Sequence, residues 1–230
     1  MSDSTPSIHI GFLLFPNVTQ LDLTGPAQVL SRVPGAKVHL IWKNTEPVVT
    51  DVGFTINPTV SFAEAPTLDV LCVPGGLGMG DQLNDAETIA FLQRQGATAR
   101  YVTSVCNGSL LLGAAGLLKG YKSACHWMWR QYLLQFGAEP VAARVVRDRN
   151  RLSGGGVTAG IDFGLTLAAE LAGEELAKSL QLMFEYDPQP PFDCGSPEKA
   201  GSERVARVLA LQEKRIKIVE EQIQRVALAL

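Results

Sequence analysis

The chain has 230 residues, of which 46% are hydrophobic and 19% are charged, and its formal net charge is −3. This length and composition suit one large α/β domain with an appended helix. The small net charge gives no electrostatic basis for binding nucleic acid or an anionic membrane. No apolar run is long enough to span a bilayer, and the first residues lack the basic and then apolar layout of a signal peptide. We therefore expect a cytoplasmic protein.

The cysteines and histidines are too scattered to predict a disulfide framework or a metal site. The chain contains no C-x-x-C pair and no H-E-x-x-H motif. Separated cysteines without a signal peptide indicate reduced thiols, and histidines without ligand spacing argue against zinc. No metal or organic cofactor is expected. The residues concerned are Cys72, Cys106, Cys125 and Cys194, and His9, His39 and His126.

Short apolar segments alternate with segments of helical composition through most of the chain. Strands are expected at residues 9–15, 37–42, 68–73, 101–105 and 122–125, and a hairpin at 141–147 and 151–153. Helices are expected at residues 24–32, 85–97, 107–118, 127–136, 158–171 and 174–186. This alternation predicts a parallel or mixed sheet with helices on both faces. In such sheets, ligands bind beyond the carboxyl ends of the strands.

A proline-rich segment, residues 187–197, precedes an amphipathic C-terminal helix. We expect an α/β domain over residues 1–186, and an arm with a helix over residues 187–230. The apolar positions of the helix recur at alternating intervals of three and four, which predicts one apolar face. That face packs either on its own domain or against a second subunit. The apolar positions are Val205, Leu209, Ile216, Val219, Ile223, Val226 and Leu230.

Cys106 has the sequence context of a nucleophile. It follows the β-branched segment 101–105 and precedes the helical segment that begins at Asn107. A strand, a sharp elbow and a helix in this order hold the central side chain at the end of a sheet, where helix N–H groups favour a thiolate. Gly108 permits the close backbone approach that an elbow needs. The alternative is a buried structural cysteine.

Asp22 and the pair Gly75–Gly76 lie at two other expected strand ends. Asp22 could act as a general acid or base beside the thiol, or it could be a carboxylate that is merely favourable near a helix N-terminus. The N–H groups of Gly75 and Gly76 could stabilise developing negative charge, as an oxyanion hole does. The alternative is a tight turn, which Pro74 also favours.

Two other segments are weaker candidates for the site. His126 could be the base of a Cys–His pair, although a histidine beside aromatic residues is more often structural. No histidine follows it, which disfavours a glutaminase-type Cys-His-Glu triad. The glycine run 154–156 and Val157 precede a helix. The signature of a phosphate-binding loop is absent. These glycines are therefore expected to allow close backbone packing near Cys106 rather than to bind a phosphate.

These motifs resemble the ThiJ/PfpI superfamily over residues 8–186. The shared residues are Pro74-Gly75-Gly76, the run from Tyr101 through Cys106 to Leu118, His126-Trp127 and the segment ending Gly-Ile-Asp162. Other segments are similar to the isocyanide hydratases of that superfamily. They are the run Gly11 to Pro16, Gln20-Leu-Asp22-Leu-Thr-Gly-Pro26, Val-Arg-Asp148 and the tail Pro-Pro-Phe192 to Pro197.

The resemblance implies a flavodoxin-like α/β fold and a homodimer in which the C-terminal helix takes part. It implies Cys106 as the nucleophile and Asp22 as its acidic partner, with Gly76 and the Asn107 region holding the reacting centre. The implied reaction adds water to an isocyanide, R–N≡C, through a thioimidate on Cys106 and without a cofactor. Such hydratases tend to carry threonine after the nucleophile, and Asn107 differs from a hydroxyl in reach and geometry.

Three other functions fit parts of this pattern. A glyoxalase- or deglycase-like enzyme acting on α-oxo-aldehydes would use the same elbow cysteine and carboxyl group. A reactive cysteine could also be an oxidation sensor. The ligand domain of a transcription regulator is less favoured. The single terminal helix leaves no room for helix-turn-helix modules, and it mixes acidic with basic residues.

Overall fold

The structure, a computed structural model, describes residues 7–228, so Leu230 and the segment before residue 7 lie outside the described residues. Its centre is a seven-stranded sheet with the order β10-β11-β7-β6-β1-β2-β5. Neighbouring strands are parallel, except that β10 and β11 are antiparallel. The strands are β1 (Ile8–Leu13), β2 (Ala36–Trp42), β5 (Val60–Ser61), β6 (Val70–Val73), β7 (Tyr101–Val105), β10 (Val145–Asp148) and β11 (Arg151–Gly154).

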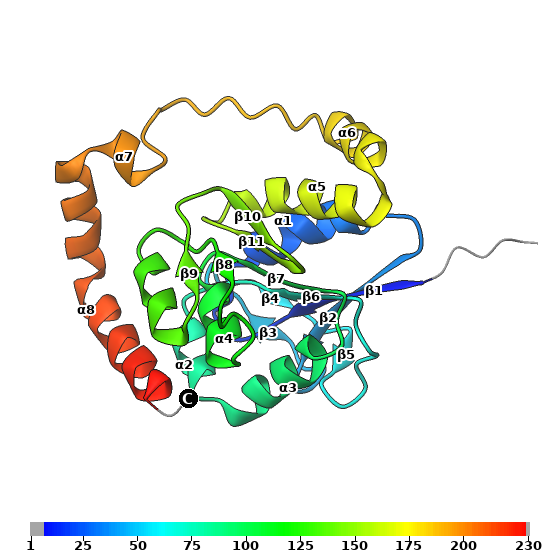
Figure 1. Ribbon diagram of the computed structural model, residues 1–230, viewed down its shortest axis with the longest axis horizontal. Helices are drawn as coiled ribbons and strands as arrows, with labels where there is room; N and C mark the ends of the chain where they lie inside the picture. The colour runs from blue at the N-terminus through cyan, green and yellow to red at the C-terminus, as the bar shows by residue number, and fades with distance from the viewer. Residues whose placement is uncertain (1–6, 229–230) are drawn as a thin grey trace, which may run out of the picture.

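Helices cover both faces of this sheet (Figure 1). One face carries α1 (Gln20–Leu30), α5 (Ala159–Ala172) and α6 (Glu174–Met183). The other carries α2 (Met79–Leu83), α3 (Ala86–Gly96), α4 (Gly108–Ala114) and the 3-10 helix η1 (Arg130–Phe136). Two small ladders pair β3 (Val48–Val49) with β4 (Thr55–Ile56), and β8 (Lys122–Ser123) with β9 (Glu139–Pro140). The predicted flavodoxin-like α/β arrangement is confirmed.

Burial explains why the central strands have nearly continuous apolar sequences. All four residues of β6 and all five of β7 are buried. A strand covered by helices on both faces cannot alternate apolar with polar side chains, since both sets face a core. The strand pattern was therefore readable from the sequence.

Several element boundaries differ from those expected; the helix expected at residues 107–118, for example, ends at Ala114. Helix α1 begins at Gln20, so Asp22 lies in its first turn and Pro26 lies inside it. Pro26 has no N–H to donate to the carbonyl group four residues earlier. For that reason proline is favoured at the start of a helix, and the sequence predicts that the helix begins beside Pro26. Residues 127–136 form only a 3-10 helix from Arg130, and the strand expected at 122–125 is reduced to β8.

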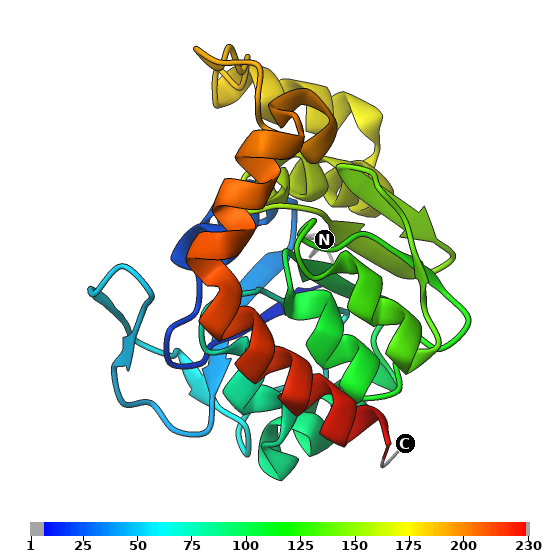
Figure 2. The ribbon, with the colours of Figure 1, turned by 90° about the vertical axis from the view of Figure 1, so that its left-hand side faces the viewer.

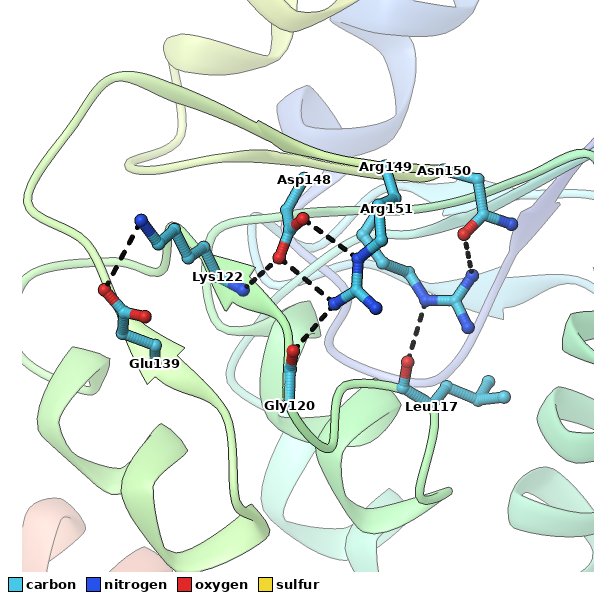
Figure 3. A network of polar contacts seen from close by, with 8 residues as sticks. All are labelled: Leu117, Gly120, Lys122, Glu139, Asp148, Arg149, Asn150 and Arg151. Carbon is cyan, nitrogen blue, oxygen red and sulfur yellow. Dashed lines mark hydrogen bonds and ion pairs between the residues drawn. The ribbon is translucent and has the colours of Figure 1, made fainter.

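The β10–β11 turn is fixed to the neighbouring loop by a polar network (Figure 3). Arg149 donates to the Asp148 carboxylate at 3.1 Å and to the Gly120 carbonyl at 2.7 Å. Its guanidinium lies 3.6 Å from the centre of the Tyr121 ring. Because β11 runs parallel to β7, with Arg151 paired to Val102, this network lies at the end of β7 remote from Cys106.

The C-terminal helix α8 (Ser202–Ala227) follows the short α7 (Pro197–Ala200). It crosses the molecule in front of the edge of the sheet at which the parallel strands have their carboxyl ends (Figure 2). It packs against α2 and η1 of its own chain. Val219 and Ile223 are buried at 3% and 0% exposure. The part of the apolar face that contains Val219 and Ile223 therefore packs on its own domain, and a contact of the helix with a second subunit stays a prediction. Within the described residues, no helix is long and apolar enough to cross a membrane.

Candidate functional site

Cys106 lies at a sharp turn between β7 and α4. Its backbone φ of 60° is in the left-handed region, which is strained for a residue with a side chain. Two contacts hold the turn: the Cys106 N–H donates to the Gly154 carbonyl at 3.1 Å, and the Cys106 carbonyl accepts from the His126 N–H at 3.3 Å. The predicted order of strand, elbow and helix is confirmed.

Gly108 allows the elbow to pack directly on the end of β6. A Cβ at this position would lie 2.2 Å from the Val73 carbonyl oxygen and 2.5 Å from that of Pro74. Both obstructing atoms belong to the backbone, so neither can move aside cheaply.

We therefore expect Gly108→Ala to destabilise the fold by about 3 kcal/mol. Equilibrium urea unfolding would measure this change. Gly195→Ala is the matched control, because a Cβ there meets no atom within 4 Å. Equal stabilities of the two variants would contradict the close approach of the elbow to β6.

Asp22 is fully buried in the first turn of α1 and faces the Cys106 thiol. Its Oδ2 accepts a hydrogen bond of 2.9 Å from the Gly75 N–H. Its Oδ1 is buried without a hydrogen-bond partner among the described residues. A buried, unpaired carboxyl oxygen is costly, and it leaves one acceptor available beside the thiol.

The two groups shift each other's proton affinity. Burial raises the pKa of Asp22 to about 7, against the lowering effects of the Gly75 N–H and the Cys106 thiol. Burial also raises the pKa of Cys106 well above its usual value, and the charges of Asp22 and Cys125 add to this. The N-terminus of α4, which favours a thiolate, is thus opposed by burial, and α4 has only seven residues.

This geometry makes Asp22 suitable for acid–base chemistry near neutral pH. A carboxyl group with a pKa of about 7 exchanges its proton readily at that pH. In its ionised form it can take the thiol proton as Cys106 attacks, and in its protonated form it can return that proton to a substrate. The pair titrates as a coupled unit, so neither group acts alone.

The glycines after β6 bind side chains of the site. The Gly75 N–H donates to Asp22, and the Gly76 N–H donates to Asn107 Oδ1 at 2.8 Å. Asn107 Nδ2 in turn donates to the Gly76 carbonyl at 3.2 Å. These N–H groups and the Asn107 side chain are thus engaged within the protein, and the expected role of Gly75, Gly76 and Asn107 in holding a reacting oxyanion stays a prediction. The backbone N–H of Asn107 is the donor that faces the Cys106 thiol.

His126 and Val157 lie near the elbow without a contact that would give either side chain a chemical role. His126 Nδ1 accepts from the Met128 N–H at 3.4 Å. Burial, together with the charge of Arg215, lowers the pKa of His126 to about 4, so the ring is neutral. Val157 is partly buried against the core in the turn after β11. The roles of both residues stay predictions.

Two charged residues near the site were missed by the sequence reasoning. Arg215 on α8 donates to the Gly76 carbonyl at 3.1 Å, across 139 residues of sequence. Asp51, in the turn between β3 and β4, accepts from the Thr19 hydroxyl at 2.6 Å and raises the pKa of Asp22. No local pattern marks either residue, since both reach the site only through tertiary packing. Among the described residues, no three metal-binding side chains come together.

The chain belongs to the DJ-1/PfpI family, whose model matches residues 9–170. It is 51% identical to an isonitrile hydratase from Pseudomonas putida, over 97% of this chain and 98% of that protein. The chain also resembles a crystal structure of a ThiJ/PfpI family protein from Pseudomonas syringae, with 46% identity and a TM-score of 0.92. The match covers 96% of this chain and 92% of that protein.

A regulator is a more distant relative. The chain is 32% identical over 77% of its length to the HTH-type transcriptional regulator GbdR of Pseudomonas aeruginosa, and it spans half of that protein. The family model and the Pseudomonas syringae structure confirm the assignment to the ThiJ/PfpI superfamily that the sequence motifs predict.

Proposed function

We propose that this protein is an isocyanide hydratase, which adds water to R–N≡C to form an N-substituted formamide. Isonitrile is another name for isocyanide, so the Pseudomonas putida relative carries the same activity in its name. The observation that carries the proposal is the buried Cys106–Asp22 pair, in a chain that matches this hydratase over nearly its whole length.

The first half of the reaction forms a thioimidate. Asp22 takes the proton of the Cys106 thiol, and the sulfur attacks the terminal carbon of the isocyanide. Asp22 then delivers the proton to that carbon, giving R–N=CH–S–Cys106. The C–S and C–H bonds form while one carbon–nitrogen π bond and the S–H bond break. Because the substrate is neutral, a mostly buried site can bind it without desolvating a charge.

The second half releases the product. Asp22 accepts a proton from water as the oxygen attacks the thioimidate carbon, and it passes this proton to the nitrogen, giving R–NH–CH(OH)–S–Cys106. The C–S bond then breaks as the hydroxyl proton passes through Asp22 to the Cys106 sulfur, and the formamide R–NH–CHO leaves. Asp22 thus serves as base and acid in turn, a task suited to a pKa of about 7.

We further propose a cytoplasmic homodimer with a catalytic unit at residues 1–186 and an arm at residues 187–230. Four free cysteines fit a reducing compartment. The edge of α8 beside α2 supports a subunit contact, because the exposed Leu77, Leu211 and Ile218 line a common hollow there. Isolated exposed apolar residues are common, whereas neighbouring ones favour an interface.

The test is formamide production by the purified protein from a simple aryl isocyanide, followed by chromatography. We expect turnover of the isocyanide and little or no conversion of methylglyoxal under the same conditions. Faster conversion of methylglyoxal than of every isocyanide tried would contradict the proposal and favour a glyoxalase-like enzyme. Absence of turnover on either substrate would favour an oxidation sensor.

A further inference from the structure

Arg215 is a half-buried arginine that lacks the usual carboxylate partner. Its guanidinium donates to the Gly76 carbonyl and lies 5.7 Å from the centre of the Trp129 ring. No ion pair within 4 Å involves it among the described residues, although the exposed Arg207 of the same helix does form one with Glu203. Buried arginines are normally paired. The positive charge of Arg215, in contrast, has no direct counter-ion among the described residues.

The Gly76 peptide connects Arg215 to the nucleophile. The Gly76 carbonyl accepts from both Arg215 and Asn107 Nδ2, and the Gly76 N–H donates to Asn107 Oδ1. Asn107 directly follows Cys106, and its own N–H faces the thiol. A change in the Arg215 contact therefore reaches the elbow through one peptide group and one buried amide.

Apart from the Asn107 N–H, which lowers the pKa of the thiol, the titratable groups around it oppose its ionisation or are neutral. Asp22 from α1 and Cys125 from the segment before η1 raise the pKa of Cys106. Asp51 from the β3–β4 turn is a second carboxylate near this cluster, and His126 is neutral because burial lowers its pKa. Arg215 brings positive charge from α8, and Cys106 and Asp51 are the groups that raise its pKa against burial.

We propose that Arg215 is a positioning residue that fixes the Gly76 peptide and stabilises the thiolate formed at Cys106 during the reaction. The thiolate forms when the thiol proton passes to Asp22, and again when the C–S bond of the thioimidate breaks. Arg215 neither gains nor loses a proton in these steps, because its guanidinium stays charged. The catalytic part rests on the proposed function, whereas the effect on the thiol does not.

The test measures alkylation of Cys106 by iodoacetamide as a function of pH, with mass spectrometry to identify the modified residue. Cys194, which is exposed, is replaced by serine in every variant. We expect Arg215→Met to raise the apparent pKa of Cys106 by about one unit and to slow alkylation about tenfold below that pKa. Arg215→Lys is expected to restore part of the shift, since it keeps the charge but not the planar fork.

Arg207→Met is the matched control, because Arg207 lies on the same helix and pairs with Glu203 on the exposed surface. It should leave the pH profile unchanged. Isocyanide turnover is measured in parallel, and we expect Arg215→Met to lower kcat about tenfold with little change in KM. If Arg215→Met does not fold, Arg215→Gln is measured instead.

A folded Arg215 variant with the wild-type alkylation profile would overturn the proposal, as would an equal shift in Arg207→Met. A loss of thermal stability without a change in profile would also overturn it, since that is a purely structural role. If the wild type lacks isocyanide turnover but the profile shifts, the hydratase assignment fails and the effect of Arg215 on the thiol stands.

Discussion

Cys106→Ala is expected to abolish isocyanide turnover, with kcat falling on the order of 10⁴-fold or more. The variant removes the only atom that can form the covalent thioimidate, and Asp22 alone would have to activate water against an isocyanide. The protein should fold, because alanine keeps the Cβ and fills the same backbone conformation. The measurement is formamide production over hours at high enzyme concentration, alongside a melting curve.

Cys194→Ala serves as the control for this variant. Cys194 is the exposed cysteine of the arm, whereas Cys72 and Cys125 are buried. It should retain wild-type kcat. Residual activity of Cys106→Ala above about one part in a hundred would exclude the thioimidate mechanism, since no other described thiol adjoins Asp22.

Asp22→Asn is expected to lower kcat by about 10²- to 10⁴-fold while leaving Cys106 in place. An amide cannot accept the thiol proton, and because burial raises the pKa of the thiol, the variant lacks the base that would remove that proton. The reaction rate of the variant should rise with pH toward the thiol pKa, whereas the wild-type rate should depend on a group with a pKa of about 7.

The same variant is expected to be more stable than the wild type above pH 7. Burial raises the pKa of Asp22 from 3.8 to about 7, so between these values the folded state holds a proton that the unfolded state has lost. The carboxyl group therefore becomes destabilising as pH rises through this window, and the cost is complete above pH 7. The gain from asparagine is about 4 kcal/mol at pH 8, or about 12 °C in Tm.

Melting curves at pH 4 and pH 8 would check this expectation. The gain should be present at pH 8 and nearly absent at pH 4, where the wild-type carboxyl group is protonated when folded. Asp187→Asn, on the exposed arm, should change Tm little at either pH. A stability gain of the same size at both pH values would show that packing, rather than ionisation, causes it.

Much of the scaffold was predictable because its signals are local. The strand predicted at residues 101–105 has the same bounds in the structure. Helices cover both faces of this strand, so its five residues are all buried and are apolar or small. Helix α3 was found from its composition, and Asp85 caps it by accepting from the Thr88 N–H. Turn residues placed Cys106 at the elbow. Local signals do not distinguish an acid–base role for Asp22 from that of a carboxylate that is merely favourable near a helix N-terminus. Only the resemblance to known hydratases favours the acid–base role.

The chemistry of the site was less predictable. The amino-acid sequence by itself determined the α/β order, the elbow cysteine and the carboxyl group at a neighbouring strand end. Tertiary structure alone decided that burial raises the pKa of the Cys106 thiol, that the N–H groups of Gly75 and Gly76 bind side chains, and that Arg215 reaches the site from α8. The reason is physical: periodicity records which side of an element faces the core, whereas proton affinity depends on how deeply a group is buried and on charges that are distant in sequence.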